Sequence, residues 1–457
     1  MKILSILVPL ILLCSPTIHS QDTLKISFEE FVDKAIANSG QIDYEKSKVN
    51  LANNRVEQAK DQRFLPKLSF QSEHSLVPGV TSPNNYPEEE IYLDPDAIND
   101  WDKVGVFTRL RVSGVQPVFT WGAINKAVNA AQIGVKAAQQ EFQASKQDFE
   151  LKLHQLYYSY VLALEIERLI KDADDKVGQI ERALNKRQDD AETDESDIFK
   201  FKVFKSQFEI QKVEVYQSLE FVKSAWKYAL RNEQNTIYEP QTKYLDPVSV
   251  DLLGLNYYQN SASINRPELR GLDYGKEAMQ TYISSLKAQN LPGLYFGFTT
   301  TLASTPIRPR QPNPFISTPE NTFNTALGFT IRQNLNFFQA NTSVERSKIE
   351  LRKISSLRQA AHDGIILQVI EAYKNATIDE TRVQKTNEAL VTTKEWLTME
   401  QLDYDFGIGE VKDLIDAMKM ELELRLKEKE SIFDFNSSVV KLNISAGLPL
   451  TGSTIKN

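Results

Sequence analysis

Hydrophobic residues follow two different spacings along this chain, and both spacings occur in each half. Short segments alternate apolar and polar residues, which is typical of strands that bury one face. Much longer segments carry hydrophobic residues three and four positions apart, which is typical of helices that pack as coiled coils. The strands are predicted at about residues 67–76, 104–113, 293–303 and 324–333.

The long helical segments form one hairpin in each half. We expect the first hairpin over about residues 120–231, turning at Asp189–Ser196, and the second over about 340–442, turning at Gly407–Gly409. An outward arm of roughly 65 residues has a length of about 100 Å at the rise of an α-helix. Sustained heptads of this kind fit a hollow helical barrel and a plain coiled coil equally well.

The two hairpins share an internal repeat with a constant offset of 216 positions. The matching pairs are Leu151 and Leu367, Leu153 and Val369, Leu156 and Ala372, Tyr157 and Tyr373, and Asp197 and Asp413. Such self-similarity indicates a duplicated fold. We therefore predict a first repeat over residues 21–240, an inter-repeat segment over 241–261, a second repeat over 262–449, and a C-terminal tail over 450–457.

Shorter elements complete each repeat. Ser27 and Glu30 form a capping-box pattern before an amphipathic helix, and a second helix is expected from about Ile42 to Arg63, ended by Leu65-Pro66. The proline-containing stretch 77–103 is predicted to be a long exposed loop, and residues 232–261 to be irregular.

The N-terminus has the pattern of a cleaved secretory signal. A lysine precedes an apolar run and a small residue, so residues 1–20 are predicted to be a signal peptide and Gln21 the start of the mature chain. Cys14 lies inside this segment, and Leu13 before it is not the small residue that lipid attachment requires. The mature chain then contains no cysteine and forms no disulfide.

Composition and charge exclude several classes of function. The net charge of −8 argues against binding to nucleic acid, which needs a basic surface. No later stretch is apolar enough for a membrane-spanning helix. The four strands would be stable in lipid only inside a closed barrel, and three copies would supply twelve strands. The alternative is a small soluble sheet.

Residues for catalysis are sparse. After the signal segment only His74, His154 and His362 remain as histidines, and none has the spacing of metal ligands. No phosphate-binding loop or nucleophile motif is present. We therefore expect no enzyme activity, no metal site and no cofactor.

Several motifs occur in the same order as in a known family. They are Ser27-Phe28-Glu29-Glu30-Phe31 with Ala35, Leu65-Pro66, Gln116-Pro117-Val118-Phe119-Thr120-Trp121-Gly122, Arg266-Pro267-Glu268-Leu269, and Tyr404-Asp405-Phe406-Gly407-Ile408-Gly409 running into Asp413-Leu414-Ile415-Asp416-Ala417. In these residues the chain resembles the TolC-like outer-membrane efflux proteins. The likeness covers nearly the whole mature chain in both halves.

The resemblance implies a mainly α fold with a small transmembrane β part, assembled as a homotrimer. Long helical hairpins form an α-helical barrel in the periplasm, and four strands per chain contribute to a shared 12-stranded barrel among outer-membrane lipid. The implied function is the exit duct of a tripartite efflux or type I secretion system. Its partners are a periplasmic adaptor (membrane fusion) protein and an inner-membrane transporter of the RND, ABC or MFS type. The alternative is a structural coiled-coil spacer or adhesin of the periplasm or cell surface.

The resemblance also implies roles for particular residues. Asp413 and Asp416 match acids that ring the pore constriction, although Asp413 in a first helical turn also suits the helix dipole. Tyr404 matches a tyrosine of the tip gate, but Gly409 stands where the relatives' arginine partner is expected. Trp121 fits a membrane-interface belt, or ordinary packing at a bend.

Overall fold

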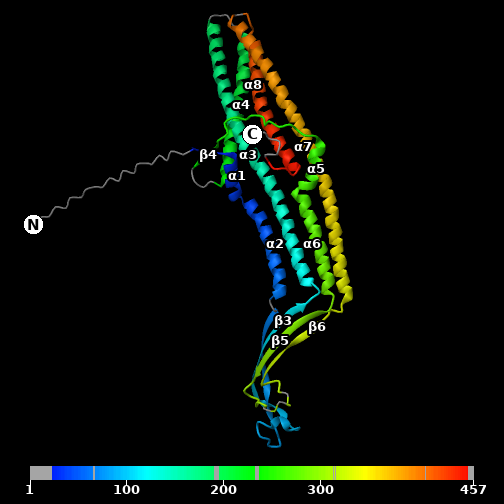
Figure 1. The fold of residues 1–457 in the computed structure, drawn as a ribbon. Coiled ribbons are helices and arrows are strands. Elements are labelled where there is room, and N and C mark those ends of the chain that lie inside the picture. The colour runs from blue at the N-terminus through cyan, green and yellow to red at the C-terminus, as the bar shows by residue number, and fades with distance from the viewer. Residues whose placement is uncertain are drawn as a thin grey trace, which may run out of the picture. The chain divides into compact units, whose positions relative to one another are not determined.

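The computed structural model describes residues 23–64, 67–189, 195–231, 236–311, 313, 315, 316, 318–406 and 408–450 (Figure 1). The chain divides into two compact units. We call Asp43–Ser145 with Ser261–Leu367 the sheet unit, and Met1–Ile42, Lys146–Asn260 and Gln368–Asn457 the hairpin unit. Each unit therefore combines segments of both predicted repeats.

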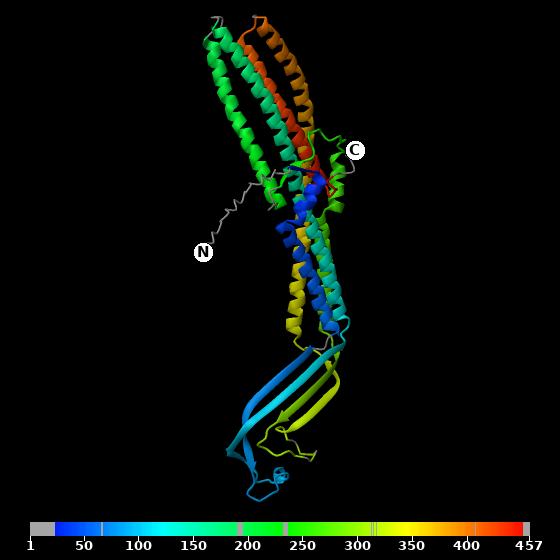
Figure 2. The same cartoon turned by 90° about the vertical axis from the view of Figure 1, so that its left-hand side faces the viewer.

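The sheet unit consists of four strands and the helical segments that lead into them. Helices α2 (Gly40–Phe64), α3 (Ala123–Asp189), α6 (Pro267–Gln289) and α7 (Phe337–Asp405) contribute to it, and within it they run side by side (Figure 2). Strands β2 (Lys67–Thr81), β3 (Ile98–Phe119), β5 (Gly293–Ser304) and β6 (Thr322–Arg332) pair antiparallel in the order β2-β3-β5-β6. The edge strands are therefore β2 and β6.

Strands lie at all four predicted places, but the first hairpin is longer than predicted. The predicted loop over residues 77–103 is confirmed only over residues 82–97, because β2 continues to Thr81 and β3 already begins at Ile98. The register shifts between Pro78 and Gly79, so the proline lies at a bulge on an edge strand, where its missing N–H is tolerated. The connecting loop contains only a short 3-10 helix, η1 (Ile91–Leu93).

The hairpin unit contains the C-terminal part of α3 from Lys146 and the C-terminal part of α7 from Gln368. The helices that follow them, α4 (Glu195–Leu230) and α8 (Val411–Ser445), belong to the same unit. It also contains α1 (Phe28–Ala37), part of α5 (Leu255–Asn265), and a parallel pair formed by β1 (Thr23–Ile26) and β4 (Ile237–Pro240). The prediction of irregular structure over 232–261 is therefore wrong at β4 and at the start of α5. A four-residue parallel strand has no signal of its own, because its partner is more than 200 residues away.

The capping box at the start of α1 is confirmed. The Ser27 hydroxyl accepts from the Glu30 N–H at 3.2 Å, and the Glu30 carboxylate accepts from the Ser27 N–H at 3.1 Å. These two bonds satisfy amide groups that the first helical turn leaves without partners. Helix α1 consequently begins where the sequence predicts and turns Phe31 and Ala35 into a core.

Two hydrophobic cores hold the hairpin unit together. The first follows heptad spacing along α3 and α4 and closes on α7 and α8. Its buried members are Ile170, Ala173, Val177, Ile180, Leu184, Phe201, Phe204, Phe208, Tyr404, Val411, Leu414, Ile415, Met418, Leu422 and Leu426.

The second core is aromatic and centres on Trp226 of α4. Its ring stacks on Phe31 with centroids 4.3 Å apart and meets Tyr160 edge-on at 5.0 Å. The indole N–H donates to the Leu156 carbonyl at 3.1 Å, so the large side chain is buried with its polar atom satisfied. This core fixes α1 against α3 and α4.

Some predictions fall outside the described residues. These are the signal peptide 1–20 with Cys14, the expected mature start at Gln21, most of the Asp189–Ser196 turn, Leu65-Pro66, Gly407, and the tail beyond residue 450.

Candidate functional site

The register of the four strands separates their side chains into two faces of opposite character. Alternate residues along each strand point to the same face, and paired residues share it. Among the residues paired from Lys67 to Pro78 on β2 and from Val104 onward on the other strands, one face, which we call the apolar face, carries no Asp, Glu, Lys or Arg. Its apolar members are Leu68, Phe70, Leu76, Val104, Val106, Leu110, Val112, Leu294, Phe296, Phe298, Leu302, Phe323, Leu327, Phe329 and Ile331.

The apolar face is unusually exposed. The exposed fraction is 65% for Leu68, 70% for Phe329 and 76% for Ile331. Exposed apolar patches of this extent mark a surface that meets lipid or another protein. His74, a polar exception on this face, has both ring nitrogens satisfied, by Ser72 Oγ at 2.9 Å and Thr108 Oγ1 at 3.0 Å.

The opposite face, which we call the polar face, carries every charged residue of the four-stranded ladder. These residues are Lys67, Glu73, Asp100, Arg109, Arg111 and Arg332. Glu73 pairs with Arg109 at 3.1 Å. The polar face therefore has an excess of positive charge, to which Lys67 and Arg332 contribute from the strand ends.

A loop folds over the far end of the polar face. A Cβ on Gly105 would lie 2.8 Å from Ile307 Cγ2, so the glycine makes room for this loop. The Arg308 guanidinium then donates to the Pro78 carbonyl and to Glu320, both at 2.8 Å. The sequence showed here only a proline-rich loop, and the cross-loop contacts of Arg308 leave no local pattern.

A cavity of about 480 Å³ lies on the polar face, where the strands give way to α3 and α6. Lys67 from one edge strand and Arg332 from the other line it, together with Tyr295, Gln62 and Gln289. The remaining lining is mostly apolar and comes from β3, β5, α3 and α6.

Trp121 stands at the turn from β3 into α3. Its φ of 54° lies in the left-handed region, which is rare for a bulky residue. The indole N–H donates to the Pro292 carbonyl at 2.8 Å, and the ring packs edge-on to Phe119 at 5.1 Å. The ring is still 48% exposed, beside the apolar face.

Tyr404 and Gly409 meet at the turn between α7 and α8. Tyr404 is buried in the first core of the hairpin unit. The amides of Ile408 and Gly409 both donate to the Asp403 carbonyl, at 3.0 and 2.9 Å. A Cβ on Gly409 would lie 2.9 Å from the Tyr404 backbone nitrogen. The turn therefore requires glycine at this position.

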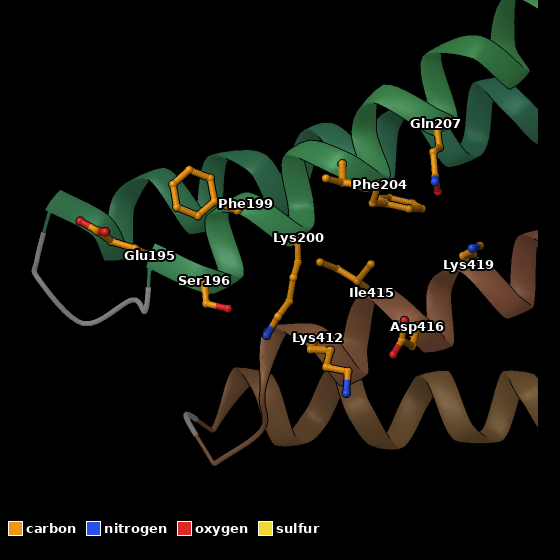
Figure 3. A pocket seen from close by; sticks show the side chains of 11 residues that line it. Glu195, Ser196, Phe199, Lys200, Phe204, Gln207, Lys412, Ile415, Asp416 and Lys419 are labelled. Atoms are coloured by element: carbon orange, nitrogen blue, oxygen red, sulfur yellow. The ribbon is translucent and has the colours of Figure 1, made fainter.

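Asp413 and Asp416 lie in the first two turns of α8, and both are exposed. Only Asp416 lines a groove of about 830 Å³ between α4 and α8 (Figure 3). The groove is also lined by Lys412 and Lys419 of α8 and by Phe199 and Lys200 of α4.

Asp197 differs from its repeat counterpart Asp413. Its carboxylate accepts from the Lys200 ammonium at 3.0 Å, one helical turn further along α4. At the repeat offset of 216 positions, Lys200 corresponds to Asp416. The first hairpin therefore neutralises its acid locally.

Among the described residues no group of three His, Cys, Asp or Glu side chains is placed to hold a metal ion. Burial against Phe28 and Tyr158 lowers the pKa of His154 to about 4. Within the described part of the chain, no helix combines the length and the hydropathy needed to cross a membrane.

Solved structures with a similar fold include outer-membrane channels. The CmeC outer membrane channel of Campylobacter jejuni is 14% identical, with a TM-score of 0.72 over 95% of this chain and 90% of that chain. The outer membrane protein VceC of Vibrio cholerae is 13% identical, with a TM-score of 0.69 over 93% and 96%. The Neisseria gonorrhoeae MtrE outer membrane channel, in its open state, is 12% identical, with a TM-score of 0.69 over 94% and 91%.

The chain has a TolC-like fold. The predicted resemblance is thereby confirmed, as is the prediction of a mainly helical chain with a smaller strand part. No family model matches the sequence, and no curated protein matches it significantly. The TolC-like fold is thus retained at an identity of 11–14%, because it depends on the spacing of apolar positions more than on particular residues.

Proposed function

We propose that this protein is the outer-membrane exit duct of a tripartite efflux or type I secretion system. The observation that carries the proposal is the four-stranded sheet with one uncharged, exposed apolar face and one polar face. In a membrane barrel the outward side chains meet lipid and the inward ones meet water. The likeness in fold to outer-membrane channels supports the same function.

The proposal includes a homotrimer. The edge strands β2 and β6 have no strand partner within the described chain, and open edges are not tolerated in lipid. Joining β6 of one copy to β2 of the next satisfies both edges, and three copies of a four-stranded sheet close a barrel of twelve strands. The polar face then lines the lumen, and Trp121 lies at the membrane interface.

We propose that the hairpin unit lies in the periplasm and packs against its copies. A second hydrophobic stripe along α4 is exposed in the single chain and comprises Phe199, Val203, Ile210, Val213, Phe221 and Tyr228. Helices with two apolar stripes pack on two sides, as the members of a helical barrel do. A periplasmic adaptor and an inner-membrane transporter of the RND, ABC or MFS type would complete the system.

We propose Asp413 and Asp416 as the constriction of the pore. Three copies would bring six carboxylates around one axis, and such rings select for cations. The turn that contains Tyr404 and Gly409 is the proposed tip gate. Its packing supports a gate that opens by movement of the whole turn, because Tyr404 is buried and Gly409 admits no side chain.

The spacer or adhesin function accounts for the helices but not for the sheet. A spacer in water would gain nothing from an apolar face on which Phe323, Leu327 and Phe329 are about 70% exposed. A duct needs that face.

The test is reconstitution of the full-length protein purified from outer membranes. We expect a trimer by native mass spectrometry that dissociates on heating, and discrete conductance steps in planar bilayers. A soluble monomer that forms no pore would contradict the proposal.

A further inference from the structure

The cavity at the helix end of the polar face has the composition of a binding site. It encloses about 480 Å³, enough for a small aromatic or amphipathic molecule. Its position on the polar face keeps it away from the apolar face that we assign to lipid. A solute in water could therefore reach it without crossing the bilayer.

The charged residues that line the cavity are all positive. Lys67 projects from β2 and Arg332 from β6, so a cation comes from each edge of the sheet. None of the described residues that line the cavity is acidic. The two carboxylates of the paired ladder, Glu73 and Asp100, do not line the cavity, and Glu73 pairs with Arg109.

The walls between the two cations are largely apolar. Ala123, Ile124 and Ala127 of α3 form one wall, and Ala288 and Leu291 form another. A ligand here would gain from burying apolar surface as well as from meeting a positive charge.

Tyr295 completes the wall, and its position depends on a glycine. A Cβ on Gly293 would lie 2.8 Å from Tyr295 Cε2 and 3.0 Å from its hydroxyl oxygen. The ring thus lies back along β5, and the Arg332 guanidinium stands 5.6 Å from its centroid. This contact leaves one aromatic face and one guanidinium on the same side of the cavity.

We propose that this cavity binds amphipathic organic anions, such as aromatic sulfonates or carboxylates. Lys67 and Arg332 hold the anionic group, and the α3 and α6 walls hold the apolar body. A role for the site in passage of such solutes rests on the proposed function, whereas binding itself does not. The site would give anionic amphiphiles a resting point on the luminal wall.

The binding test uses naphthalene-2-sulfonate and its uncharged analogue 2-naphthol. Calorimetry on the full-length protein, purified in an uncharged maltoside detergent, measures both affinities at about 50 mM salt. We expect the sulfonate to bind at least ten-fold more tightly than the naphthol. We also expect its affinity to fall several-fold at about 500 mM salt, because added ions screen the two cations. Equal affinities would overturn the proposal.

Single substitutions assign the site. Lys67→Gln and Arg332→Gln are each expected to weaken sulfonate binding about five-fold, and both together about twenty-fold. Arg111→Gln is the matched control, because Arg111 lies on the same face but does not line the cavity. Lys67→Arg should retain binding. If Arg111→Gln lowered the sulfonate affinity as much as Lys67→Gln, the effect would come from the overall charge of the polar face. That result would overturn the assignment of the site.

Planar bilayers separate this proposal from the proposed function. A conducting wild type whose current is reduced by the sulfonate, less so in the Lys67→Gln and Arg332→Gln double variant, supports both proposals. If the wild type and the double variant both conduct and the sulfonate blocks their currents equally, the binding site is overturned but the channel function is not. If calorimetry shows specific binding of the sulfonate but the protein does not conduct, the channel function is overturned and the binding site stands. Sulfonate binding abolished by adding anionic phospholipid would identify a lipid as the occupant and contradict a soluble ligand.

Discussion

The ring of Phe298 on β5 lies directly over Gly114 on β3. A Cβ on Gly114 would be 2.3 Å from Phe298 Cε1 and 2.9 Å from Leu68 Cδ2, so the absence of a side chain creates the space for both neighbours. The glycine therefore lets three strands share one continuous apolar surface.

Gly114→Ala is expected to destabilise the sheet. Forcing the ring aside costs about 1–3 kcal/mol in a packed apolar layer. The measurement is the midpoint of thermal unfolding, by circular dichroism, of the protein purified in detergent. Gly328→Ala is the control, because a Cβ on that glycine of β6 would meet nothing within 4 Å. Equal midpoints for the two variants would show that the Phe298 contact has no energetic role.

Trp121→Phe is expected to lower stability by about 1 kcal/mol, because the indole donor to the Pro292 carbonyl is lost while the unusual φ remains. A second measurement tests the interface position. Brominated lipids should quench tryptophan emission less in this variant than in the wild type. Trp396→Phe, on α7 in the hairpin unit, should leave that quenching unchanged.

Replacing both Asp413 and Asp416 by Asn is expected to remove cation selectivity in planar bilayers. Multivalent cations should then block at concentrations at least ten-fold higher, because the proposed ring of carboxylates is gone. Asp197→Asn is the matched control, since that acid is already paired with Lys200. Selectivity that survives the double substitution would assign the constriction to other residues.

Gly409→Ala is expected to disturb the turn between α7 and α8. The added methyl would press on the backbone of Asp403 and Tyr404, which cannot move aside as a flexible side chain can. We expect a loss of about 1–3 kcal/mol and more frequent current fluctuations in single channels. Gly364→Ala, in the body of α7, has open space and should be neutral or slightly stabilising.

The stability of the hairpin unit is expected to fall in acid through His154. Its folded pKa of about 4 lies below the unfolded value of about 6.5, so the unfolded chain binds the proton first. Stability is therefore full above about pH 6.5 and falls as the pH drops toward about 4, by at most about 3 kcal/mol. Nδ1 has no hydrogen-bond partner among the described residues, which leaves a bound proton without an acceptor.

Thermal unfolding between pH 4 and 7 checks this expectation. His154→Phe should flatten the profile, since an aromatic ring beside Phe28 and Tyr158 is kept while the titrating group is removed. Parallel profiles for the wild type and His154→Phe would exclude the histidine as the cause.

The parts of the fold that sequence predicted well are those with a repeated local pattern. Ile170, Ala173, Val177, Ile180 and Leu184 recur at heptad spacing, and this spacing alone predicts a packed helix. The alternation on β5 and β6 likewise predicts strands. The features that were missed depend on partners distant in sequence, as in the pairing of β1 with β4.

The candidate site was only partly predictable for the same reason. Trp121 and Asp416 were identifiable because they belong to a motif with known order. Lys67 and Arg332 are more than 250 residues apart, and neither belongs to a motif. They line one cavity although they come from the two edge strands of the sheet.

The open edges of β2 and β6 have a consequence for how the protein is made. Under the proposed closure, no single newly exported chain can enter the hydrocarbon layer, because two rows of backbone amides and carbonyls would have no partners there. Insertion must await an encounter of three chains. Until then, the exposed phenylalanines and leucines need a holding chaperone, and the yield of assembled protein should rise more steeply than the first power of its synthesis rate.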